Sequence, residues 1–171
     1  MDSDATFGRT QLLGFYLLAA LVVVLDWWTK SLASSLLDYG VPHVITPLFN
    51  LTLLHNRGAA FSLLSEAGGW QHWLLGGIAL AVSVAIVVAL RRLPRAARWQ
   101  GLGLALVLGG AIGNLGDRLR LGYVVDFIQV HYQELYWPAF NIADSAITVG
   151  AVLMVWDQFF GSGARHRSDA H

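Results

Sequence analysis

The chain of 171 residues is 56% hydrophobic and only 13% charged, with a mean hydropathy of +0.54. A soluble domain of this size is typically about 25% charged, so the composition indicates an integral membrane protein. Eleven basic and eleven acidic side chains balance, which gives no indication of a nucleic-acid surface, and the absence of cysteine excludes disulfides, thiolate catalysis and cysteine metal sites.

Four apolar stretches are long enough to cross a membrane. They cover residues 12–33, 70–90, 99–116 and 137–156. Each approaches or exceeds the roughly 20 helical residues that span about 30 Å of hydrocarbon. We therefore predict one integral membrane domain over residues 1–171, built as an α-helical bundle of four transmembrane helices. A polar tail over residues 161–171 is expected to be disordered.

The distribution of basic residues predicts the orientation. An even number of spans places both termini on one side of the membrane. On that side lie Arg9, Arg91, Arg92, Arg95, Arg98, Arg165 and Arg167, and on the other side Arg57, Arg118 and Arg120. The excess of positive charge predicts that both termini are cytoplasmic and that residues 34–69 and 117–136 face outward.

The outward segment 34–69 differs from an ordinary short connection. Residues 49–53 alternate apolar and polar side chains, and Asn56, Arg57 and Gly58 follow with residue types common in turns. This pattern predicts a small β-containing subdomain on the outer face. Its many apolar side chains are expected to let it lie on the bilayer.

Polar side chains within the spans are costly in hydrocarbon, so each needs a structural or functional reason. Asp26 and Lys30 lie one helical turn apart with the acid first, the favourable order for an ion pair. We interpret them as a structural pair that makes mutual burial tolerable, with Arg118 placed to join them. Counting 1.5 Å per residue puts Asp26, Asn114 and Asp144 in one layer near the outer interface.

Asp144 has no basic residue near it in the sequence, since none occurs over residues 121–164. A second acid, Asp126, lies in an apolar run just after the third span. If that run folds back onto the bundle, the two carboxyl groups meet and share a proton, as an aspartic protease requires. Alternatively, Asp126 is a loop acid and Asp144 is a helix-packing acid bonded to Asn114 or Asn141.

Five sequence blocks carry a resemblance to one known family. They are residues 26–30 (DWWTK), 56–62 (NRGAAFS), 109–118 (GGAIGNLGDR), 125–127 (VDF) and 140–145 (FNIADS). With these blocks in this order, the chain resembles the bacterial lipoprotein signal peptidases, or signal peptidase II, which are membrane aspartic proteases. The resemblance covers nearly the whole chain, including the four spans.

The resemblance implies roles for individual residues. It assigns the two catalytic aspartates to Asp126 and Asp144, with lining or supporting roles for Asn56, Gly58, Asn114, Arg118 and Asn141. Gly58, Ala59 and Ala60 suit a mobile flap that closes over a peptide. The aspartic mechanism requires no metal, no cofactor and no covalent intermediate.

The implied reaction is hydrolysis of the bond before the diacylglyceryl-modified cysteine of a bacterial prolipoprotein, which releases the signal peptide. The expected partners are this prolipoprotein, membrane lipid and globomycin-type inhibitors, with no nucleic acid, and the expected state is a monomer. The expected location is the bacterial cytoplasmic (inner) membrane, with the active site near the outer face.

A small proton- or ion-coupled transporter is the alternative from another functional class. Asp, Lys and Asn side chains within a membrane also mark ion pathways. A transporter of this kind predicts paired inverted repeats and acids near the midplane of the bilayer. The sequence shows no repeat, and its acids cluster toward one face.

Overall fold

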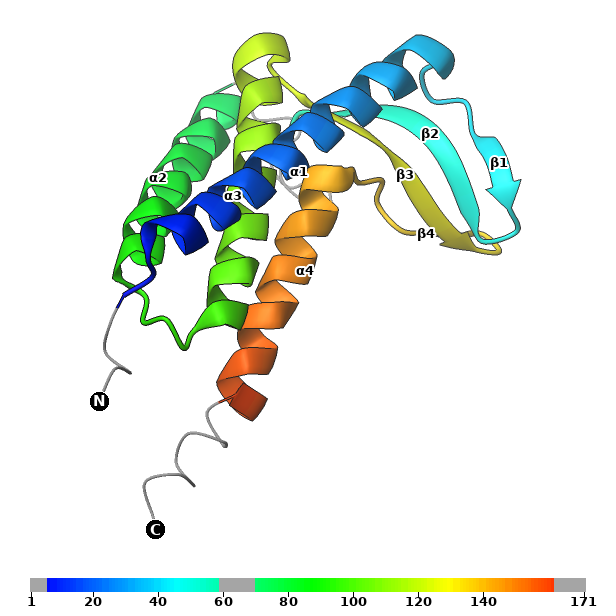
Figure 1. The fold of residues 1–171 in the computed structure, drawn as a ribbon. Coiled ribbons are helices and arrows are strands. Elements are labelled where there is room, and N and C mark those ends of the chain that lie inside the picture. The colour runs from blue at the N-terminus through cyan, green and yellow to red at the C-terminus, as the bar shows by residue number, and fades with distance from the viewer. Residues whose placement is uncertain (1–5, 59–69, 162–171) are drawn as a thin grey trace.

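The computed structural model describes residues 6–58 and 70–161. Its elements are α1 (Arg9–Leu36), β1 (His43–Thr46), β2 (Phe49–Asn56), α2 (Gln71–Arg92), α3 (Arg98–Leu121), β3 (Val124–Tyr132), β4 (Leu135–Tyr136), α4 (Ile142–Trp156) and the π-helical turn η2 (Asp157–Gly161). The helices form a bundle, and one four-stranded sheet projects from the end opposite the start of α1 (Figure 1). The polar tail, from residue 162 onward, lies outside the described residues.

Four helices in the described part of the chain are long and apolar enough to span a membrane. They are α1, α2, α3 and α4 with its continuation into η2. Helices suit this environment because they satisfy all their backbone hydrogen bonds internally, where no water is available. α3 packs against each of the other three helices and is the central member of the bundle. The predicted fold class, a four-helix membrane bundle with a small β-containing subdomain, is confirmed.

Glycines in α3 let α4 approach very closely. A Cβ atom on Gly103 would lie 2.7 Å from the carbonyl oxygen of Gly150, and one on Gly150 would lie 2.5 Å from that of Gly103. Further along the helix, Gly110 packs against the backbone of Ala143, which is fully buried. Small residues at such crossings allow backbone contact between membrane helices. The start of α4 is therefore held firmly against α3.

The helices differ from the predicted spans by up to five residues at their ends, and two of these differences bear on the site. α4 begins at Ile142 rather than near residue 137, because Pro138 disfavours a helix before it and Asn141 caps the first turn by accepting from the backbone N–H of Asp144 at 2.9 Å. α3 continues past residue 116 to Leu121. The extension includes Asp117, whose carboxylate lies 3.0 Å from Lys30 Nζ.

The apolar run after α3 is the strand β3, which was not predicted as a strand. Gly122, with a φ of +77°, ends α3 in the left-handed conformation that glycine tolerates, and the chain turns back at once into β3. β3 lies antiparallel to β2 in the sheet order β1-β2-β3-β4, with Leu54 opposite Asp126. Ile128 also bridges Phe140, just before α4. The sheet thus brings β3 alongside the start of α4.

Candidate active site

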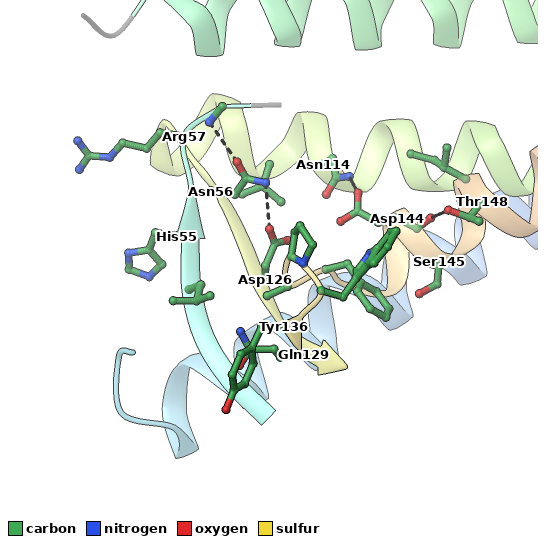
Figure 2. Close-up of a pocket in the computed structure, with 18 of the residues that line it drawn as sticks. His55, Asn56, Arg57, Asn114, Asp126, Gln129, Tyr136, Asp144, Ser145 and Thr148 are labelled. Carbon is green, nitrogen blue, oxygen red and sulfur yellow. Dashed lines mark hydrogen bonds between the residues drawn. The ribbon is translucent and has the colours of Figure 1, made fainter. Parts of the chain in front are cut away.

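A cavity of about 960 Å³ lies where the sheet meets α3 and α4. Figure 2 shows Asp126 from β3, Asp144 from α4 and Asn114 from α3 in its wall, with Asn56 from β2 beside Asp126. Apolar and aromatic lining is contributed by Tyr136, Trp137, Phe140, Ile147 and Val149. The cavity is therefore acidic at one place and apolar along α4.

Asp126 is almost completely buried, with 2% of its surface exposed. Its Oδ1 atom accepts a hydrogen bond from Asn141 Nδ2 at 2.7 Å, and its Oδ2 atom accepts one from Asn56 Nδ2 at 3.1 Å. Burial, followed by the nearby charge of Asp144, raises the pKa of Asp126 to about 7. Asp126 therefore keeps a proton at pH values where an exposed carboxyl group is ionised.

Asp144 lies in the first turn of α4 and accepts hydrogen bonds from two groups. Asn114 Nδ2 donates to its Oδ1 atom at 2.7 Å, and the backbone N–H of Asn141 donates to its Oδ2 atom at 3.4 Å. Asn141 also donates from Nδ2 to Asp126 and to Asn114 Oδ1. Two amide side chains thus connect the two carboxyl groups, and Asn141 is fully buried between them.

Charged side chains of α1 and α3 form a network next to the two acids and outside the cavity lining. Lys30 Nζ lies 2.7 Å from Asp26 Oδ2 and 3.0 Å from Asp117 Oδ2, and it donates to Asn114 Oδ1 at 3.0 Å. Asp26 and Lys30 are 1% and 3% exposed. The three protons of the ammonium group match three acceptors, so its burial is well compensated.

Two acids of this network also accept hydrogen bonds from the backbone beside the catalytic candidates, at Ala143 before Asp144 and at Val125 before Asp126. Asp26 Oδ1 accepts from the backbone N–H of Ala143 at 2.9 Å, and Asp117 Oδ2 accepts from the backbone N–H of Val125 at 3.1 Å. Asp117 was missed in the sequence. Asp117 lies three residues after Asn114 in α3, so both side chains are on one face of the helix. This spacing is the sequence feature that could have identified Asp117 as a neighbour of the site.

Arg118 does not join the ion pair of α1. Its guanidinium group donates to the backbone oxygen of Asn114 at 3.4 Å and lies in the cavity wall, where its charge is attracted to Asp144 and Asp126. Arg118 thus places a positive charge in the cavity wall near the acids, whereas the positive charge of Lys30 lies outside the cavity lining.

The end of β2 contributes Asn56, Arg57 and Gly58 to the wall. The backbone N–H of Gly58 donates to Asn56 Oδ1 at 3.1 Å, which leaves the amide nitrogen of Asn56 to face Asp126. The turn therefore orients a hydrogen-bond donor toward the acid. Ala59 and Ala60, the rest of the expected flap, lie outside the described residues.

His55 is a further residue of the cavity wall. Its ring stacks on Tyr123 at a centroid distance of 4.1 Å and contacts Tyr39 at 4.8 Å. Burial and the adjacent charge of Arg57 lower the pKa of His55, so it is neutral near neutral pH. It forms an uncharged aromatic part of the wall.

The fold and the site together define a multi-pass membrane protein in which one buried and one partly buried carboxyl group line the same cavity. Residues 18–160 match the family signal peptidase (SPase) II. A lipoprotein signal peptidase from Teredinibacter turnerae is 54% identical over 158 residues, 92% of this chain and 94% of the relative. One from Pseudomonas fluorescens is 50% identical over 160 residues, 92% of each chain.

Two solved bacterial membrane enzyme structures, determined by the in meso method, share the fold. The first has a TM-score of 0.76 at 30% identity and covers 93% of this chain and 92% of its own. The second has a TM-score of 0.74 at 29% identity and covers 94% of this chain and 98% of its own. The chain belongs to the signal peptidase II family and is a membrane peptidase. The transporter alternative receives no support.

We expect Asp26→Asn to reduce stability more than catalysis. The amide keeps an oxygen that accepts from the backbone of Ala143 but removes one of the two acids next to Lys30. Breaking a buried ion pair costs about 3 kcal/mol, toward the lower end here because Asp117 remains. Thermal unfolding in detergent and kcat are measured on the same preparation. A stable but inactive variant would instead place Asp26 in the catalytic machinery.

Proposed function

We propose that this protein is an aspartic endopeptidase that cleaves the bond before the diacylglyceryl-modified cysteine of bacterial prolipoproteins. One observation carries the aspartic mechanism: Asp126 and Asp144 line one cavity and are joined through two amide side chains. The substrate class follows from the family and from relatives that are named lipoprotein signal peptidases.

The proposed mechanism gives the two acids different tasks. Asp126, which keeps its proton to about pH 7, donates a hydrogen bond to the scissile carbonyl oxygen. Asp144 takes a proton from a water molecule as the water oxygen attacks the carbonyl carbon. The tetrahedral intermediate collapses when Asp144 passes this proton to the leaving amine, which breaks the C–N bond, restores the carbonyl group and returns Asp144 to its ionised form. No covalent bond to the protein forms at any step.

The proposed setting is the bacterial cytoplasmic (inner) membrane, with both termini cytoplasmic and the active site near the outer face. The basic residues on the side of the termini support this orientation. The acids, the amides and the charges behind them all come from one chain, which supports activity as a monomer. Globomycin-type cyclic peptides are expected to bind between the two acids.

The rate should fall on the alkaline side of about pH 7. The proposed active form carries one proton on the acid pair, and that proton is on Asp126. Because the pKa of Asp126 is raised to about 7, the protonated form persists below that pH and is lost above it. The profile of kcat/KM against pH in detergent measures this loss. A rate that stays constant up to pH values about two units higher would contradict the assignment.

The proposed function is tested by incubating the purified chain with diacylglyceryl-modified prolipoprotein and sequencing the new N-terminus. We expect cleavage before the modified cysteine, undiminished by EDTA. The oxygens of both aspartates already face N–H donors, which repel a cation, so a metal is not expected between them. Loss of cleavage in EDTA with recovery on adding zinc would require another mechanism.

A further inference from the structure

Asn114 forms hydrogen bonds both to Lys30 of α1 and to Asp144 of the acid pair. Its side-chain oxygen accepts from Lys30 Nζ at 3.0 Å, and its side-chain nitrogen donates to Asp144 Oδ1 at 2.7 Å. An amide has one accepting end and one donating end, so its direction decides whether its neighbour must accept or donate. Whatever orients Asn114 therefore determines what Asp144 does in this contact.

Lys30 is the group that orients Asn114. An ammonium group has donors only, so it holds the oxygen end of the amide and turns the NH₂ end toward Asp144. Asn141 also donates to the Asn114 oxygen, at 3.2 Å, but its two N–H groups are shared among three acceptors. The bond from Lys30 is shorter and is assisted by charge, which makes it the stronger one.

We propose that Lys30 is a positioning residue for the hydrolysis: by orienting Asn114, it fixes Asp144 as the hydrogen-bond acceptor and so as the base of the pair. This role rests on the aspartic mechanism proposed above. Lys30 is 3% exposed and lies behind Asn114, so it acts through that side chain and not on substrate. Without Lys30, the amide can present its oxygen to Asp144, which then has to hold the proton.

Other charged groups surround the acid pair, but they do not orient this amide. Arg118 in α3 donates to the backbone oxygen of Asn114 rather than to its side chain. Asp26 and Asp117 contact the ammonium itself. His55 and Arg57 belong to the β2 side of the cavity. Among the described residues, Lys30 is the charged donor to the Asn114 side chain.

The test removes the ammonium without leaving its closest acid unpaired. The double variant Asp26→Asn/Lys30→Met loses both charges, and the new amide retains an oxygen for the backbone of Ala143. We expect kcat on lipidated prolipoprotein to fall by about 10- to 100-fold with KM unchanged, because a misplacement of about 1 Å at a reacting group can cost about a hundredfold in rate. Ser83→Ala, which removes a buried hydroxyl that donates to the backbone oxygen of Ala79 within α2, is the matched control and should keep the parent rate.

A double-mutant cycle separates positioning from general loss of structure. If Lys30 acts through Asn114, adding the charge-removing pair to Asn114→Ala should lower kcat by less than about twofold further. Independent effects would instead multiply. A double variant Asp26→Asn/Lys30→Met that folds and keeps kcat within about twofold of the parent, or fully multiplicative effects, would overturn the proposal.

Infrared spectroscopy gives a readout that does not depend on turnover. At about pH 6, the C=O band of a protonated carboxyl group should disappear in Asp126→Asn and persist in Asp144→Asn. In the Asp26→Asn/Lys30→Met background, Asp144→Asn should also reduce this band. An unchanged pattern would overturn the role of Lys30. A parent chain that fails to cleave lipidated prolipoprotein contradicts the proposed function instead, and the infrared result still decides the role of Lys30.

Discussion

Replacing either Asp126 or Asp144 by Asn is expected to lower kcat by about a thousandfold or more. An amide has nearly the volume of a carboxyl group, but it can neither take a proton from water nor deliver one to the leaving amine. Each acid has its own task in the mechanism, so neither can replace the other. The fold should survive, because neither change alters the volume of the side chain appreciably or adds a charge to the site.

The comparison needs a matched change away from the cavity. Asp38→Asn alters an exposed acid between α1 and β1 and should keep the parent rate. Single-turnover and steady-state cleavage of lipidated prolipoprotein are measured for all three variants, together with thermal unfolding. If both cavity variants retained a tenth or more of the parent kcat, the two acids would not be the catalytic pair.

The helices and the importance of the acids could be predicted from sequence, because the apolar interior of a bilayer constrains both the length of a spanning helix and the charges within it. Runs of about 20 apolar residues span it, and a charge within such a run needs a reason. The ion pair of Asp26 and Lys30 follows from local spacing in one helix. Whether Asp126 reaches Asp144 could not be derived from the residues themselves, because it depends on the turn at Gly122 and the pairing of β3 with β2.

The supporting contacts were harder to find because they connect distant parts of the chain. Asp117 follows the third apolar run in the sequence, and its contact with Lys30 from α1 is visible only in the structure. Asn141 both caps α4 and bonds to Asp126, and the second contact requires the strand that the sequence did not reveal. Local patterns predict helix ends within a few residues, but they contain no information on which side chains meet across the bundle.

A prolipoprotein whose cysteine lacks the diacylglyceryl group is expected to be cleaved about a hundredfold more slowly, with kcat reduced as well as affinity. The acid pair lies where the sheet meets the bundle, and its cavity extends along α4 as far as Ile147 and Val149. Both residues belong to a helix long and apolar enough to span the membrane. We therefore expect a substrate to reach the acids with its lipid still in the bilayer.

Acyl chains should act through position more than through binding energy. Burying a methylene from water contributes about 0.8 kcal/mol, but a chain that moves from lipid to an apolar protein surface gains little of this. We expect the chains to give the cysteine a fixed depth, and with it a fixed place for the scissile carbonyl beside the two acids. A misplacement of about 1 Å at a reacting atom can cost about a hundredfold in rate.

The test compares three forms of one purified precursor in the same bilayer: diacylglyceryl-modified, unmodified, and alkylated at the cysteine with a small polar group. The alkylated form keeps the thioether but lacks the chains, so it separates the chemistry of the sulfur from the anchoring by lipid. We expect the unmodified and alkylated forms to be equally poor, in kcat and in apparent affinity. Equal cleavage of all three would refute positioning by lipid, because the signal helix alone would then be sufficient to hold the bond at Asp126 and Asp144.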